Sequence, residues 1–309
     1  MSQHRRRIRR RTAASALVAA ALVVAASACS AAGGGTEGVA TGPGTGSTTD
    51  VAFLHQAAAA TGEATTLGFS LETSITGLSG VGDLSNRVTG EIDRQAHRAH
   101  LTTDLGGVLG ELAGAEAGDG SVELVLDGDT AYLRSPLYTR LAGSDRPWLS
   151  VSAEDLADLG SPGGGGQADP TDLLGFLEGA GGELTELGHE EVRGVDTRHV
   201  STEIDLKGLL AKVDDDRRQV LQEALDRLGG DPDALVTIPA EAWVDADGHV
   251  RRFTLTFDFS KGAAELPGLG DVAITSTYDL YDLDEPVDIA VPDPADVAPL
   301  DVPKLLGGN

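Results

Sequence analysis

The sequence predicts an α+β protein, mainly β, in which a single large antiparallel sheet carries a few helices on one face. Three observations lead to this fold class. Segments of alternating apolar and polar residues recur between positions 67 and 283, turn residues separate them, and two stretches with helical spacing interrupt the series. Strands joined by tight turns favour one continuous antiparallel sheet, because parallel strands need long crossover connections.

The N-terminus is predicted to be a signal peptide over residues 1–28. Arginines without any acidic residue begin this segment, and an apolar stretch over 13–28 comes after them, too short for the ~20 residues that cross a bilayer as a helix. Small residues precede Cys29, the only cysteine, so we expect its thiol to carry diacylglyceryl and palmitate groups at the extracytoplasmic face of the cell membrane. The alternative is an ordinary secretory signal, since Ala26 stands where lipoprotein sites prefer Leu.

Residues 29–50, from the lipidated cysteine onward, are predicted to form a flexible tether. Gly, Thr, Ala and Ser dominate this segment, which cannot bury enough apolar surface to offset the entropy cost of ordering. A flexible chain of ~20 residues has an end-to-end distance of roughly 25 Å. Such a tether holds a domain just clear of a lipid surface.

The body of the chain, residues 51–290, is predicted to begin with a helix over 51–61 that Asp50 caps. The hydrophobic period then changes to two, which predicts a series of strands. They cover 67–75, 87–92, 96–103, 122–126, 130–134, 147–151, 183–187, 197–204, 238–244, 250–259 and 272–283. The pairs Asp127-Gly128 and Asp247-Gly248 predict hairpin turns, because Gly tolerates positive φ.

Two helical segments are predicted between the strands, over 169–177 and 205–228. A cap residue followed by Pro begins the first, whereas acidic residues begin the second and two glycines end it. The Gly-rich stretches at 106–120 and 161–166 are interpreted as surface insertions, and 291–309 as a C-terminal tail.

Charge and composition exclude several classes of function. The chain has 49 acidic and 23 basic side chains, a net charge of −26. Nucleic-acid binders and basic membrane-surface proteins need Lys and Arg to neutralise phosphates, so both classes are excluded. A single cysteine excludes a disulfide framework and a Cys-based zinc site. Neither a nucleophile-elbow motif nor a phosphate-loop motif occurs. We therefore expect no enzyme, no catalytic residue and no cofactor.

Histidines and one acidic turn are the remaining candidates for a metal site. His97 and His100 are three residues apart on a predicted strand, so they point to opposite faces. His189 and His199 flank a turn but lack a patterned third ligand. Asp245 begins a segment that resembles the start of a calcium loop, yet the closing Glu is absent. We interpret that segment as a hairpin turn and expect no metal.

Five segments lie in the order and spacing of a known family, over most of residues 50–290. They are 122–134, 147–148, 169–174, 190–200 and 240–252. In these segments the chain resembles the LppX/LprG-type actinobacterial lipoproteins, relatives of the LolA-like lipoprotein carriers. The resemblance implies a strongly curved half-barrel whose concave side is covered by helices. It also implies an apolar cavity between sheet and helices that holds acylated lipids or glycolipids, and no catalytic residues.

The expected function is therefore lipid binding and transport by an extracytoplasmic lipoprotein of the cell envelope. Its expected partners are an acylated lipid or glycolipid, the cell membrane and an envelope transporter. The alternative is a non-enzymatic scaffold lipoprotein that uses the same fold with a filled cavity. The candidate cavity residues are apolar and share the predicted inward side of their strands. They are Phe69, Leu71, Ile75, Leu101, Leu124, Leu126, Val244, Phe253, Leu255, Phe257, Ile274 and Tyr278.

Overall fold

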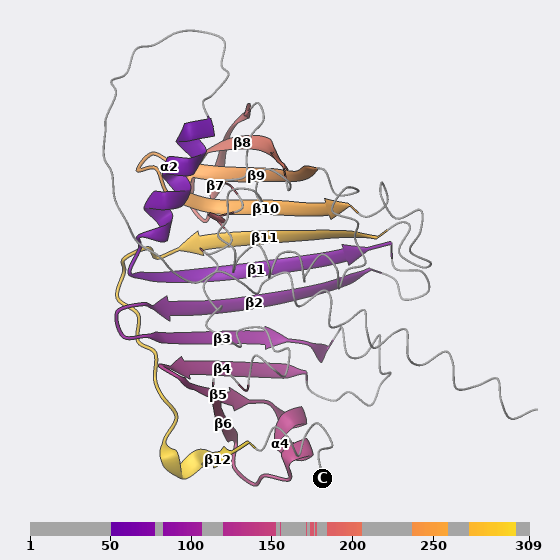
Figure 1. The fold of residues 1–309 in the computed structure, drawn as a ribbon, viewed down its shortest axis with the longest axis vertical. Helices are drawn as coiled ribbons and strands as arrows, with labels where there is room; N and C mark the ends of the chain where they lie inside the picture. Colours follow the sequence, from indigo (N-terminus) through magenta and orange to yellow (C-terminus); the bar gives the residue numbers. More distant parts are fainter. Residues whose placement is uncertain are drawn as a thin grey trace, which may run out of the picture.

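The computed structural model describes residues 51–77, 83–106, 120–152, 155, 171, 174–175, 177, 184–205, 237–258 and 272–300 (Figure 1). Cys29 with the predicted signal peptide and tether lies outside these residues, as do 107–119, 161–166 and all but the first residue of the predicted helix over 205–228. Of the predicted helix over 169–177, four residues are described.

The described chain begins with a helix and consists mostly of strands after it. The helical elements are α2 (Val51–Gly62), α4 (Pro136–Ala142) and the 3₁₀ turn η3 (Pro294–Asp296). The strands are β1 (Thr66–Thr76), β2 (Leu84–Asp93), β3 (Arg98–Asp104), β4 (Ser121–Asp127), β5 (Thr130–Arg134), β6 (Trp148–Ser152), β7 (Thr185–Val192), β8 (Val195–Asp205), β9 (Thr237–Asp245), β10 (Val250–Asp258), β11 (Ala273–Tyr281) and β12 (Val297–Pro299).

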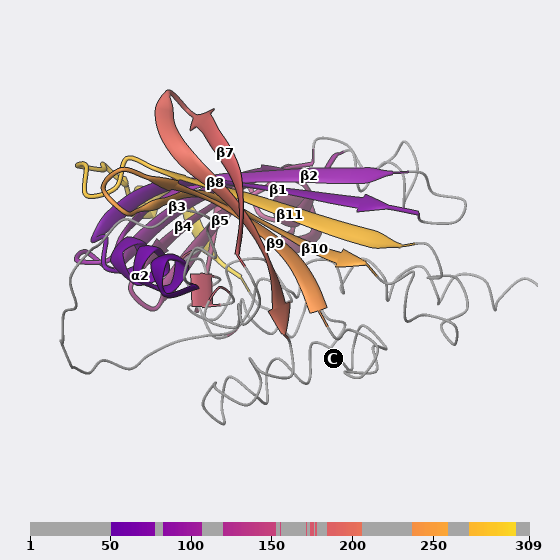
Figure 2. The same cartoon turned by 90° about the horizontal axis from the view of Figure 1, so that it is seen from above.

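All twelve strands belong to one sheet, in the order β12-β6-β5-β4-β3-β2-β1-β11-β10-β9-β8-β7. Neighbouring strands are antiparallel, except that β12 is parallel to β6. The first strand lies near the middle, between β2 and β11, so it joins the two halves of the sheet. The sheet is open and curved, with α2 on one side of it (Figure 2). The predicted fold class is confirmed, and each predicted strand overlaps an observed one.

Both predicted Asp-Gly turns are present. Gly128 has φ +58° in the turn between β4 and β5, and Gly248 has φ +86° in the turn between β9 and β10. Residues with a side chain rarely adopt this left-handed backbone, which explains why Gly occupies both positions.

Asp245 organises the second of these turns. Its carboxylate accepts hydrogen bonds from the backbone N–H of His249 (2.8 Å) and from Nε of Arg251 (2.5 Å), and it also accepts one from the N–H of Asp247. Burial raises the pKa of Asp245, but the hydrogen bonds from His249 and Arg251 outweigh burial and leave that pKa below its ordinary value. The segment that resembles the start of a calcium loop is thus a hairpin turn held by its own first carboxylate.

Besides the 3₁₀ turn η3, the structure adds two elements that the sequence pattern did not predict. Helix α4 begins with Pro136 and ends at Ala142. The left-handed backbone of Gly143, the next residue (φ +65°), lets its N–H donate to the carbonyl of Arg140. The second element is β12, which lies in the expected C-terminal tail and pairs with Trp148 and its neighbours at the edge of the sheet. Seven and three residues are too short for hydrophobic periodicity to be recognised.

The two faces of the sheet differ in polarity. On one, here called the inner face, apolar side chains from nearly all strands join the side chains of α2 in one hydrophobic cluster. The opposite face is here called the outer face. It carries threonines, charged residues and histidines, which alternate along the strands with the inward apolar residues. Within the residues that the structure describes, no helix is both long and apolar enough to cross a membrane.

Candidate functional site on the inner face

Of the twelve predicted cavity residues, nine belong to the inner-face cluster and three pack against it. Nine are buried, with relative exposures between 0% and 7%, whereas Leu71, Ile75 and Leu126 are half-buried. They come from six strands, β1, β3, β4, β9, β10 and β11. The strand register therefore gathers residues that are far apart in the sequence on one apolar surface.

The register arranges these side chains in rows across the strands. One row runs from Phe253 through Tyr278 and Leu71 to Val88. The rings of Phe253 and Tyr278 stack with centroids 4.5 Å apart and planes 5° apart. Burial raises the pKa of the Tyr278 hydroxyl, so this group stays protonated. A second row, further along the same strands, runs through Phe257, Ile274, Ile75 and Leu84.

Gly90 allows a close approach within this surface. A Cβ atom at Gly90 would lie 2.7 Å from the ring of Phe69 and 2.6 Å from the carbonyl oxygen of His100. Both distances are far below van der Waals contact, so only Gly lets the Phe69 ring lie over β2.

Helix α2 covers one part of the inner face. Leu54 and Ala57 are buried against the cluster, and α2 lies next to β10. Thr61 anchors the helix, because its hydroxyl accepts a hydrogen bond from the N–H of Val250 (2.8 Å) and donates one to the carbonyl of Ala57 (2.7 Å). The twelve residues of α2 form a helix about 18 Å long, whereas the twelve strands of the sheet span roughly 50 Å. Helix α2 therefore covers only part of the inner face. Leu174 and Leu177 of the predicted helix over 169–177 join the same cluster.

Exposure varies across the inner face. Over β8, β9 and β10 its side chains are buried, whereas several over β1 to β4 are half-buried. We call the latter the β1–β4 strip; it consists of Leu71, Thr73, Ile75, Asn86, Thr103, Val122 and Leu126. The described elements pack less completely over this strip than over the strands near α2.

Polar residues interrupt the apolar rows at one level. Ser276, Thr73 and Asn86 lie side by side on β11, β1 and β2, and all three face inward by their register. The hydroxyl of Thr103 on β3 donates to the Asn86 side-chain oxygen (2.9 Å). We call these four residues the inner polar patch. The sequence analysis did not single them out, although Thr73 stands at an apolar position of the alternation over 67–75 and Ser276 at the inward phase of its own strand.

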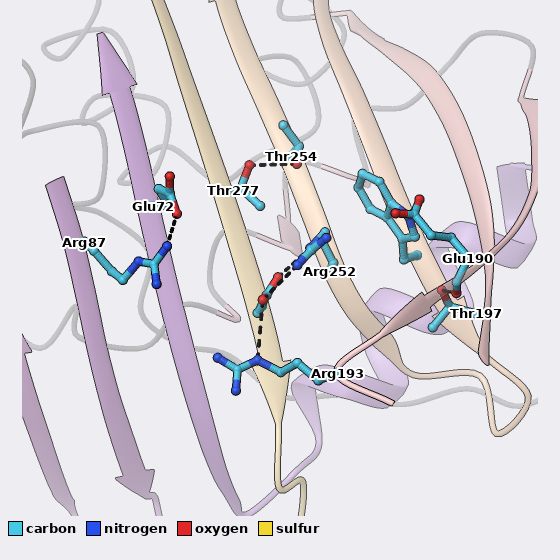
Figure 3. Close-up of polar contacts among 10 residues, drawn as sticks. Glu72, Arg87, Glu190, Arg193, Thr197, Arg252, Thr254 and Thr277 are labelled. Carbon is cyan, nitrogen blue, oxygen red and sulfur yellow. Dashed lines mark hydrogen bonds and ion pairs between the residues drawn. The ribbon is translucent and has the colours of Figure 1, made fainter. Parts of the chain in front are cut away.

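The outer face carries paired charges around β8 to β11 (Figure 3). Asp279 accepts hydrogen bonds from Arg252 (2.6 and 3.0 Å), and Arg193 lies 3.4 Å from the same carboxylate. The hydrogen bond from Arg252 to Asp279 is the main cause of a raised pKa for Arg252. Arg193, in the turn between β7 and β8, also lies over the ring of Tyr281 at 3.8 Å. These contacts fasten the β7–β8 hairpin to β11.

A second outer-face cluster surrounds Trp243. The ring of His199 stacks on the Trp243 ring, with centroids 4.0 Å apart. Trp243 donates its indole N–H to Glu190 (2.9 Å), and His199 Nε2 lies 2.9 Å from Glu241. The two carboxylates each bind one ring of the aromatic pair, which ties β7, β8 and β9 together.

Two other histidines, His100 and His189, also contact single carboxylates. His100 Nε2 lies 3.0 Å from Glu123, and His189 Nδ1 lies 3.1 Å from Asp196. His97 lies in the turn before β3 with φ +54°. In the described part of the chain, no three His, Cys, Asp or Glu side chains come together in a group that could hold a metal ion.

Comparison with known proteins gives one sequence relative and several similar structures. No family model matches the chain. A 31.2 kDa protein of Streptomyces griseus, encoded in the rplA–rplJ intergenic region and described as uncharacterised, is 29% identical over 151 residues. The match covers 46% of this chain and 48% of that protein, so it spans about half the length of each.

Among solved structures, the chain is similar to two mycobacterial proteins. Lipoprotein LppX of Mycobacterium tuberculosis has 17% identity and a TM-score of 0.43, with 78% of this chain and 97% of LppX covered. LprF of Mycobacterium bovis has 14% identity and a TM-score of 0.43 over 78% and 96%. A LolA superfamily protein of Nitrosomonas europaea gives 8% identity and a TM-score of 0.27 over 75% and 93%.

Proposed function

We propose that the chain is a membrane-anchored extracytoplasmic lipoprotein that binds an acylated lipid or glycolipid on its inner face and carries it within the cell envelope. The observation that carries the proposal is the single apolar surface to which six strands contribute all twelve candidate residues. An apolar sheet face of this width is suited to a ligand that is itself long and apolar.

The energetics of a lipid in water favour such a carrier. Exposing a chain costs about 0.8 kcal/mol for each CH₂ group, so even one acyl chain needs a shielded surface on its way through the aqueous envelope. Aliphatic walls shield the chain without directional bonds, so release needs no strong polar contact to be broken.

Differences in exposure favour a position of the acyl chain over the β1–β4 strip. Leu71 and Ile75 are half-buried there, whereas Phe253 and Leu255 are at most 2% exposed under cover of the protein itself. A lipid-contacting side chain keeps accessible surface until the lipid arrives, so the half-buried positions are the better lipid contacts. The buried ones serve as the core on which the strip rests.

Delivery to the envelope is proposed from the N-terminal sequence. Acylation of Cys29 would anchor the chain, and the tether over 30–50 would let the domain reach a second membrane component, with an envelope transporter as its partner. Three acyl chains give effectively permanent attachment, whereas a single one is marginal.

A second candidate function is a scaffold for envelope proteins. The near-complete burial of Val244, Phe253 and Leu255 favours it, because side chains fill this part of the inner face. Transfer kinetics separate the two candidates. Donor vesicles loaded with a self-quenched acylated lipid are mixed with acceptor vesicles and a trace of mature protein in detergent-free buffer. A carrier accelerates dequenching in proportion to its concentration, whereas a scaffold leaves the spontaneous rate unchanged.

A further inference from the structure

The inner polar patch places polar side chains on a surface that is otherwise apolar. Ser276, Thr73 and Asn86 occupy one level of three adjacent strands, so their side chains follow one another at roughly 5 Å. Apolar rows flank this level on both sides along the strands. The row of Leu71 and Tyr278 lies on one side, and the row of Ile75 and Ile274 on the other.

These polar groups are short of partners. Ser276 is 9% exposed, and neither its hydroxyl nor that of Thr73 has a hydrogen-bond partner among the described residues. The Asn86 side-chain oxygen accepts from Thr103, while the Asn86 amide N–H groups have no partner within the described ranges. Further along the same level, on β8, the buried hydroxyl of Thr202 also lacks a partner there.

The Thr202 hydroxyl is fully buried without a partner in the described structure, which is costly for folding because it loses water without gaining another bond. Thr73 and Asn86 are half-buried, so their polar groups remain accessible to a ligand. The threonines on the outer face of β10 and β11, in contrast, have partners. Thr277 pairs with Thr254 at 3.0 Å and Thr275 lies 3.4 Å from Thr256. The inner patch is therefore a place where the described fold leaves hydrogen-bonding capacity unused.

We propose that the inner polar patch binds the carboxylic ester of a lipid whose hydrocarbon extends in both directions along β1. The hydroxyls of Ser276 and Thr73 and the amide of Asn86 donate hydrogen bonds to the ester oxygens. The two hydrocarbon arms lie on the flanking apolar rows. This inference rests on the proposed function and narrows its ligand: an ester set between two chains is preferred, and a plain hydrocarbon is not.

The test compares two probes of equal length. Vesicles of a diether phosphocholine, which contains no ester, carry either palmityl palmitate or the n-alkane with the same number of carbons. The chain from Cys29 onward, produced without its signal peptide so that Cys29 stays unlipidated, is stripped of lipid, incubated with each vesicle and separated from it by flotation. The probe retained for each protein molecule is then measured by mass spectrometry. The double variant Thr73→Val with Ser276→Ala removes the two hydroxyls and keeps the side chains small.

Wild type should retain at least about five-fold more ester than alkane, the net effect of one or two neutral hydrogen bonds. The double variant should lose most of this preference, because only the Asn86 amide remains as a donor, and its melting temperature should be no lower than that of wild type. The outer-face variant Thr275→Val should keep the wild-type ratio. An undiminished ester preference in the double variant, or none in wild type, overturns the ester site and leaves lipid binding standing. Retention of neither probe by wild type overturns the proposed function and the ester site together.

Discussion

Substitution of Leu71 by Trp separates a lipid surface from a packed core. Leu71 lies at the centre of β1, between Tyr278 and Val88 of the neighbouring strands, and it is half-buried. If an acyl chain occupies the space above Leu71, the indole can turn into that space. The variant Leu71→Trp should then fold with near-native stability and lose its lipid.

The matched comparison is Leu255→Trp, at a position that is 2% exposed between the small side chains of Ala240 and Ser276. Overpacking a filled core costs typically 1–3 kcal/mol. For a domain of this size each kcal/mol lowers the melting temperature by about 2–4 °C, so Leu255→Trp should melt about 2–12 °C lower. Leu71→Trp should stay within about 2 °C of wild type.

The melting temperature and the lipid content of both Trp variants are measured on the same preparations. Differential scanning fluorimetry gives the melting temperature, and extraction followed by mass spectrometry gives the lipid retained for each protein molecule. The reasoning is refuted if Leu71→Trp is destabilised as much as Leu255→Trp while its lipid content equals that of wild type, because Leu71 would then belong to the filled core.

Four other substitutions probe the anchor, a turn and the packing of the inner face. Cys29→Ala should release the protein from the membrane or leave an unprocessed precursor, whereas wild type partitions into the detergent phase. Asp245→Asn should lower the free energy of unfolding at pH 7 by about 2–3 kcal/mol, through weaker hydrogen bonds in its turn. Since the folded-state pKa of Asp245 is lowered, the wild-type advantage should be complete above about pH 4 and disappear as the pH falls through that lowered pKa. Gly90→Ala should cost about 1–3 kcal/mol, because its Cβ displaces the Phe69 ring. Thr202→Val should raise stability by about 1 kcal/mol, since it removes a buried hydroxyl without a partner in the described structure.

Two of these substitutions have matched control variants, and the other two have outcomes that would contradict the reasoning. Ser30→Ala leaves the thiol of the anchor in place and should partition like wild type. Gly62→Ala adds a methyl group with nothing within 4 Å, so it should not destabilise. Urea unfolding at several pH values measures the Asp245→Asn series, and an equal difference at pH 7 and pH 2.5 would contradict the role given to the carboxylate. An unstable Thr202→Val variant would mean that its hydroxyl is satisfied by water or by residues beyond those described.

The strands could be predicted because their information is local. In β1 the alternation of Phe69, Leu71 and Ile75 with small or polar residues is enough to locate the strand and its apolar side. The Asp-Gly turns then specify antiparallel neighbours. Helix α4 was missed although its Pro136 and Gly143 are typical helix-end residues, because seven residues are too few to show a helical period and none of them is buried.

Pairing between distant segments could not be predicted from periodicity. The partner of β1 on one side is β11, which lies far from β1 in the sequence, and the register sets Thr73 beside Ser276. A single threonine at an apolar position of a strand pattern carries no information by itself, because its neighbours on the adjacent strands are not known from the sequence. For the same reason the sequence selected twelve inward apolar residues but could not separate the half-buried Leu71 and Ile75 from the buried Phe253.

Native mass spectrometry of the wild-type chain, purified from the membranes of its own producer, tests the central claim most directly. Gentle desolvation preserves a bound lipid, and stronger activation then ejects it for identification. The account predicts one lipid for each protein molecule, with a mass that corresponds to an ester-containing acylated species distinct from the Cys29 anchor. A spectrum with only the processed, anchored protein, unchanged after incubation with lipid extract from the same cells, would contradict it.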